Sequence, residues 1–158
     1  MSLGWSSLTF SPDAEAVQTL RAAWAWLITE PYKPVLFSVL GDPFLQVESG
    51  TILWLNTGTA ELTEVARSWE HFVELLSTEQ ADEWFMPGLV EQLHGAGKVP
   101  GSGQCYTYVT LPIFVEGKYE VSNLNPVAAK EHFAFTGEVH QQIRNFPNGA
   151  QVKVVIEP

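Results

Sequence analysis

The sequence predicts an α+β fold in which a mostly antiparallel meander sheet has helices packed around it. Between residues 34 and 66, short apolar runs alternate with glycine-containing turns, which is typical of an antiparallel meander. From Ser68 onward the apolar residues recur with the period of a helix. The chain has 158 residues, 46% of them hydrophobic, which is enough to bury one core. We therefore expect a single domain over residues 1–158, with a helical lead-in at 1–34 and the α+β domain at 35–158.

The lead-in is expected to be one helix from Ser11 to Thr29. Ser11 is a natural N-cap, and Pro12 suits the first helical position because its missing N–H is no loss there. Prolines follow at positions 31 and 34 and end the helix. The apolar stripe of this helix comprises Val17, Leu20, Trp24, Leu27 and Ile28.

Four strands are expected next, at Pro34–Leu40, Phe44–Val47, Thr51–Asn56 and Glu61–Ala66. The third carries apolar side chains at every position from Ile52 to Leu55. Because successive side chains of a strand point to opposite faces, we expect the sheet to be covered on both sides.

Three helices are expected after the sheet. Ser68 can cap the first, which would turn Trp69 and Phe72 inward. The second lies around Thr78–Phe85, and the third follows Pro87 and ends at glycines 95 and 97.

The last third of the chain reads less clearly. Cys105–Leu111 has strand propensity. Asn125 and Pro126 repeat the signal of a cap followed by proline, so we expect a helix there, although the aromatic residues at 133 and 135 would equally suit a strand. A turn at 147–149 and a strand at Val152–Ile156 end the chain. The apolar stripe of the expected helix comprises Val127, Glu131, Phe135, Val139 and Ile143.

The formal charge is −10, from 18 acidic and 8 basic residues. Binding to nucleic acid draws its main energy from Lys and Arg, so this charge argues against it. From Asp42 to Glu91 there are ten acidic residues and a single basic one, Arg67. Two interpretations stay open: a solvated face that keeps the protein soluble, or a surface that steers a basic partner.

Other features indicate a cytoplasmic protein. No apolar run approaches the roughly 20 residues that cross a bilayer, and the first residues do not resemble a signal peptide. Cys105 is the only cysteine, so no intramolecular disulfide can form.

No catalytic signature is present: the chain lacks a Walker loop, a dinucleotide-binding glycine pattern, a nucleophile elbow and a His-Glu-x-x-His motif. On one helix, His132 and His140 would lie two turns apart, too far for one metal ion. We therefore expect neither metal nor cofactor, and no enzyme. An alternative is a small-ligand or catalytic pocket near Cys105, Tyr106 and Tyr108.

Several motifs resemble a known bacterial family. They are Gly41-Asp-Pro-Phe44, Gly50-Thr-Ile-Leu-Trp-Leu-Asn56, Val65-Ala-Arg-Ser-Trp-Glu70, Asp82-Glu-Trp84, Leu89-Val90, Leu93, Pro100-Gly-Ser-Gly-Gln-Cys-Tyr106, Pro112, Gly117-Lys-Tyr119, Asn123 and Gly137-Glu-Val-His-Gln-Gln-Ile143. With them, roughly residues 35–156 resemble the C-terminal domain of an immunity protein against a type VI secretion DNase effector. That family is similar in style to the SUKH (SMI1/KNR4-like) immunity proteins. The chain departs from it at Val115-Glu-Gly117, where the family often has Leu-Gly-Gly, and many relatives carry a further N-terminal domain.

The resemblance implies a SUKH-like domain over 35–158 and a cytoplasmic protein that neutralises a toxin, possibly a nuclease, by binding it. The partner is then a cognate toxin rather than nucleic acid or membrane, and the oligomeric state stays open. A regulatory or scaffold module that binds a host protein is the alternative. The expected contact residues are acidic: Glu70, Glu74, Glu79, Asp82 and Glu83.

Overall fold

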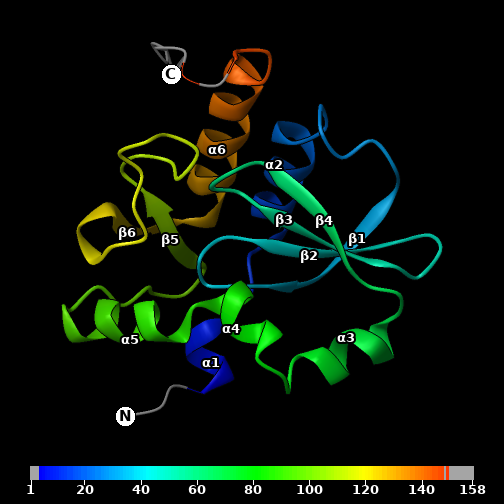
Figure 1. The fold of residues 1–158 in the computed structure, drawn as a ribbon, viewed down its shortest axis with the longest axis horizontal. Helices are drawn as coiled ribbons and strands as arrows, with labels where there is room; N and C mark the ends of the chain where they lie inside the picture. The colour runs from blue at the N-terminus through cyan, green and yellow to red at the C-terminus, as the bar shows by residue number, and fades with distance from the viewer. Residues whose placement is uncertain (1–3, 148, 150–158) are drawn as a thin grey trace.

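The computed structural model describes residues 4–147 and 149, and its main sheet has four antiparallel strands in the order β1-β2-β3-β4 (Figure 1). Their bounds are β1 Tyr32–Phe37, β2 Pro43–Val47, β3 Ile52–Asn56 and β4 Glu61–Ala66. The predicted α+β meander is therefore confirmed. A second, two-stranded sheet pairs β5 Gln104–Tyr108 with β6 Leu124–Ala128.

Helices cover both faces of the main sheet. The helical elements of the described residues are α1 Trp5–Leu8, α2 Ala14–Ala23, α3 Trp69–Leu75, α4 Gln80–Phe85, α5 Pro87–Gly95, the 3₁₀ turn η1 Val121–Asn123, and α6 Ala129–Ile143. One core cluster joins Ile52 to side chains of α3, α4 and α5, and the other joins Leu55 to side chains of α2 and α6. The continuous apolar run of β3 thus predicts correctly that the sheet is covered on both sides. None of the helices in the described part of the chain is long and apolar enough to cross a membrane.

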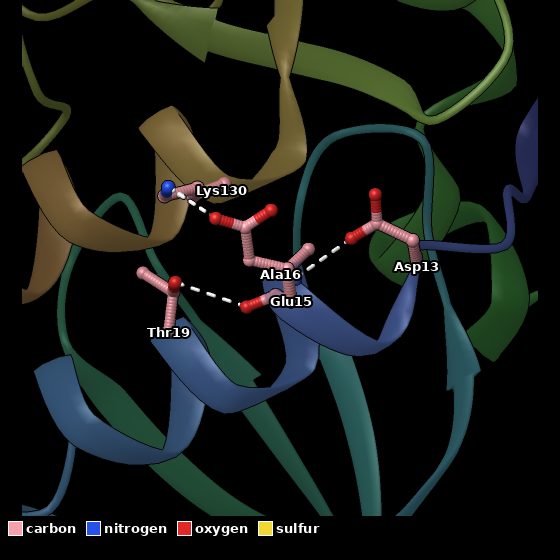
Figure 2. A network of polar contacts seen from close by, with 5 residues as sticks. All are labelled: Asp13, Glu15, Ala16, Thr19 and Lys130. Carbon is pink, nitrogen blue, oxygen red and sulfur yellow. Dashed lines mark hydrogen bonds and ion pairs between the residues drawn. The ribbon is translucent and has the colours of Figure 1, made fainter.

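The lead-in helix is shorter than expected at both ends. It begins at Ala14, because the Asp13 carboxylate, and not Ser11, caps it by accepting a hydrogen bond from the N–H of Ala16 at 2.8 Å (Figure 2). It ends at Ala23, and the turn that follows still buries Trp24 completely.

Helix α2 packs along α6. Lys130 at the start of α6 pairs with Glu15 in the first turn of α2 (Figure 2). Gly137 allows the close approach further along, because a Cβ at that position would lie 2.5 Å from the carbonyl oxygen of Ala23. The lead-in and the C-terminal helix therefore form one layer behind the sheet.

The helices after the sheet follow the prediction, with one exception. Ser68 caps α3 by accepting from the N–H of His71 at 3.1 Å, and Phe72 is completely buried. Trp69, expected to point inward, is 41% exposed. Phe72 takes the inward position, and Trp69 packs on its ring from outside, with the centroids 5.7 Å apart.

The predicted helix at Asn125-Pro126 is wrong in its start and its buried face. Both residues belong to β6, where Pro126 pairs with Tyr106, and α6 begins at Ala129. Glu131, placed inward by the prediction, is exposed, because the buried face of α6 follows His132, Thr136 and His140 instead. Its buried residues are Ala129, His132, Phe133, Thr136, Gly137, Val139 and His140.

Two strand predictions also need correction. The first strand runs from Tyr32 to Phe37 rather than from 34 to 40, and it is an edge strand of the sheet. The strand expected over Cys105–Leu111 ends at Tyr108. The strand expected at Val152–Ile156, and position 148 of the expected turn, lie outside the described residues.

Candidate functional site

The five carboxylates expected to contact a partner lie on two consecutive helices. Glu70 and Glu74 are on α3, Glu79 is the N-cap residue of α4, and Asp82 and Glu83 are within α4. We call these five residues the acidic helical face. All five are exposed, and none forms an ion pair with a side chain in the described part of the chain.

An exposed apolar strip accompanies the carboxylates of α3. Trp69 is 41% and Val73 is 44% exposed, and they lie one turn apart. An exposed tryptophan beside charged residues is typical of a protein-binding surface, where Trp is over-represented among the residues that dominate affinity.

A cavity of about 570 Å³ opens between β3, β4 and α4. It brings Asp82 and Glu83 together with Glu61 of β4, whereas Glu70, Glu74 and Glu79 lie outside it. No Lys or Arg lines it. We call this cavity the acidic groove; its lining residues are Leu40, Asp42, Trp54, Asn56, Glu61, Thr63, Val65, Gln80, Asp82, Glu83, Trp84, Met86 and Tyr119.

Beneath the groove lies a buried polar cluster, formed by Asp42, Thr57, His132 and His140. Thr57 donates hydrogen bonds from its backbone N–H and its hydroxyl to Oδ1 of Asp42, both at 2.8 Å. Burial raises the pKa of Asp42 to about 7, and the two bonds from Thr57 oppose that shift.

His132 connects this cluster to α6. Its Nε2 lies 3.1 Å from the carbonyl oxygen of Gly41 and 2.9 Å from Oγ1 of Thr57. A carbonyl oxygen can only accept, so Nε2 carries the proton, and Nδ1 accepts from the hydroxyl of Thr107 at 2.8 Å. Burial lowers the pKa of His132 to about 4, so the ring is neutral at pH 7.

His140 completes the connection one helical turn beyond Thr136. Its Nε2 donates to the carbonyl oxygen of Thr57 at 2.9 Å, and burial lowers its pKa as well. The cluster therefore joins the β3–β4 turn to α6 through hydrogen bonds inside the protein. The sequence analysis missed it, although polar residues four apart at 132, 136 and 140 were a readable signal of one polar helix face.

The cluster is poorly placed for catalysis. The hydroxyl of Thr107 and the imidazole of His132 resemble a nucleophile and its base, but His132 is completely buried and its low pKa makes it a weak base. Within residues 4–147 and 149, no group of three or more His, Cys, Asp or Glu side chains could hold a metal ion.

The strand considered for a small-ligand pocket is packed into the core. Cys105 and Tyr106 are 0% exposed and Tyr108 is 3% exposed. Burial raises the pKa of the Cys105 thiol far above its ordinary value, which disfavours the reactive thiolate. All three side chains belong to the core clusters of the described residues.

A loop from Val109 to Tyr119, which the sequence analysis did not single out as a binding surface, exposes apolar side chains beside the groove. Val109 is 65%, Ile113 46% and Val115 86% exposed, and Tyr119 lines the groove. The Asn123 side chain holds the base of this loop through bonds to the backbone of residues 110 and 118. An anchored loop with an apolar tip suits recognition of another protein.

These features define an acidic α+β protein whose surface is suited to binding. Residues 66–140 match the model of a protein family described as T6SS immunity protein Tdi1, C-terminal, where T6SS is the type VI secretion system. The match runs from the last residue of β4 into α6 and covers a little under half of the chain. The resemblance to this immunity family is therefore confirmed for that segment; the similar motifs at 41–65 lie outside it. No curated protein matches the chain.

Proposed function

We propose that this protein is an immunity protein that neutralises a secreted bacterial toxin by binding it, without catalysis. The observation that carries the proposal is the family match over residues 66–140, since that segment contains all five residues of the acidic helical face. The match also includes the anchored apolar loop at 109–119. We propose that residues 1–158 act as one domain.

The charge of the surface supports a basic toxin, and a nuclease is the kind we propose. A nuclease presents a basic cleft to its phosphate substrate, so an acidic inhibitor gains association rate and orientation from the opposite charge. The five carboxylates form no ion pairs within the described residues and are open to such contacts. A toxin that attacks nucleic acid acts in the cytoplasm, which is where we place its inhibitor.

A pull-down tests the proposal. The tagged protein serves as bait in a lysate of its source bacterium at low and at moderate salt. We expect one stoichiometric partner with toxin-like activity, whose activity falls when the bait is added back and whose retention weakens with salt. A housekeeping complex instead of a toxin would replace the proposal with the regulatory or scaffold module.

Charge reversal on the isolated pair locates the contact. The variant Glu70→Lys/Glu74→Lys should associate with the toxin about tenfold more slowly at low salt, with a weaker salt dependence. The matched control is Glu30→Lys/Glu48→Lys, which makes the same change of charge at two exposed residues outside the acidic helical face. Equal slowing in both variants would show that net charge, and not the acidic helical face, steers the association.

A further inference from the structure

The floor of the acidic groove holds a carboxylate whose hydrogen bonding is half complete. Asp42 is 3% exposed and lines the groove. Both hydrogen bonds to its side chain come from Thr57 and go to Oδ1. Among residues 4–147 and 149, none donates a hydrogen bond to Oδ2. This oxygen belongs to a carboxylate that lines the groove, so it can accept a hydrogen bond from a group that enters there.

The walls of the groove suit a cation. Glu61 stands on the β4 side, and Asp82 and Glu83 stand on the α4 side, with no basic residue in the lining. Trp54 and Tyr119 add aromatic rings. A planar guanidinium stacks on aromatic rings and donates several hydrogen bonds in one plane, which a lysine ammonium cannot do.

We propose that the acidic groove receives an arginine side chain of the protein partner, whose guanidinium donates to Oδ2 of Asp42 and lies against the aromatic walls. The inference rests on the proposed function only for the identity of that partner. It adds a specific receptor for one side chain to the general attraction exerted by the acidic helical face.

Binding of a cation there is linked to a proton. The guanidinium pairs with ionised Asp42, so an arginine that enters displaces the proton from the carboxyl group. With a pKa of about 7 for Asp42, binding should be about tenfold weaker at pH 6 than at pH 8. The ionisable groups around Asp42 are Cys105 and Tyr108 of β5, Tyr119, Glu61 of β4, Asp82 and Glu83 of α4, and His132 of α6 through Thr57. Of these, His132 stays neutral over this pH range, because its pKa is about 4.

The test uses the whole protein and a small probe. Protein labelled with ¹⁵N at its tryptophans is titrated with N-acetyl-arginine N-methylamide at 150 mM salt, and the indole signals are followed, with Trp54 assigned from a Trp54→Phe variant. We expect a saturable shift of the Trp54 signal. The lysine analogue should bind more weakly, and the citrulline analogue, a neutral isostere of arginine, should not saturate.

Two single-charge variants make the test specific. Asp42→Asn should weaken binding of the arginine probe at least tenfold. Glu64→Gln removes one charge from an exposed residue of β4 outside the groove lining and should weaken it less than twofold. Equal weakening, or a Trp54 signal that never saturates with the arginine probe, would overturn the proposal. If Asp42→Asn does not fold, the pH dependence of the wild-type protein decides, and equal affinity at pH 6 and pH 8 counts against it.

The result is independent of the pull-down. Saturable binding of the arginine probe without any toxin partner would leave the groove as an arginine receptor and overturn the proposed function. The opposite result is a toxin partner that is retained equally by the wild type and Asp42→Asn, with no binding of the probe. It would support the proposed function and overturn the arginine site in the groove.

Discussion

The buried polar cluster and the acidic helical face contain ionisable side chains in opposite environments. In the cluster, Asp42 and His132 are buried, Thr57 donates to Oδ1 of Asp42, His132 donates to the carbonyl oxygen of Gly41, and the pKa of each group is shifted toward its neutral form. On the face, the five carboxylates stand in water without ion pairs in the described part of the chain. The difference teaches that stability and recognition rest mainly on different groups in this protein: the cluster joins the sheet to α6, and the face is left for a partner. Asp42 is the one member of the cluster that also lines the groove.

The largest expected effect is on the cluster, through Gly41. This residue has φ +83°, and a Cβ would lie 2.1 Å from Nε2 of His132. We expect Gly41→Ala to lower the free energy of unfolding by about 3 kcal/mol or more, from backbone strain plus a steric clash. Urea denaturation measures it.

A substitution at a second glycine, Gly50, separates the effect of backbone strain from that of the steric clash. Gly50 has φ +94° but open space around its would-be Cβ, so Gly50→Ala should cost only the strain, about 1–2 kcal/mol. An equal loss in both variants would show that the contact between Gly41 and His132 contributes nothing.

The sequence predicts best the elements that local signals define. Strand β4 has the expected bounds, Glu61–Ala66, and the Ser68 cap forms as expected, because alternation, turns and caps act within a few residues. The start of α6 could not be found this way. Pro126 lies in a strand because its neighbour is Tyr106, twenty positions earlier in the chain.

The site shows the same division. That Glu70 and Glu83 are exposed follows from local helix patterns, and the structure agrees. That Asp42 is buried beneath a groove does not, because its partner Thr57 is fifteen residues away and His132 lies in another element. A polar residue is buried only where distant partners satisfy it, and those partners are not visible in a local pattern.

The next effect is a pH dependence of stability in which Asp42 and the histidines of the cluster act in opposite directions. The pKa of Asp42 rises from 3.8 to about 7 on folding, so its contribution to stability is full below pH 3.8 and is lost as the pH rises to 7. The pKa of His132 falls from 6.5 to about 4, so stability is gained as the pH rises from 4 to 6.5. The lowered pKa of His140 acts in the same direction as that of His132. Each group changes the free energy of unfolding by up to about 1.4 kcal/mol per pH unit, and in the wild type the two slopes oppose each other.

In Asp42→Asn, the carboxyl group no longer titrates, so the histidines alone contribute to this pH dependence of the free energy of unfolding. We expect its stability to rise from pH 4.5 to pH 6.5 by about 1 kcal/mol per pH unit more than that of the wild type, measured by urea denaturation at several pH values. Glu64→Gln, at an exposed residue, should follow the wild-type profile. If the profile of Asp42→Asn runs parallel to the wild type, the Asp42 carboxyl group does not titrate differently in the folded and unfolded states.

The smallest expected effect is on the acidic helical face. Glu70→Gln/Glu74→Gln should change the free energy of unfolding by less than about 0.5 kcal/mol. The two carboxylates are four residues apart on α3, so neutralising both relieves a repulsion of about 0.2–0.5 kcal/mol. It also removes the favourable interaction of Glu70 with the helix N-terminus, which is worth about 0.3–1 kcal/mol. Urea denaturation at pH 7 measures the balance. A loss of more than about 1 kcal/mol would show that Glu70 and Glu74 stabilise the fold, so that the acidic helical face would serve stability as well as recognition.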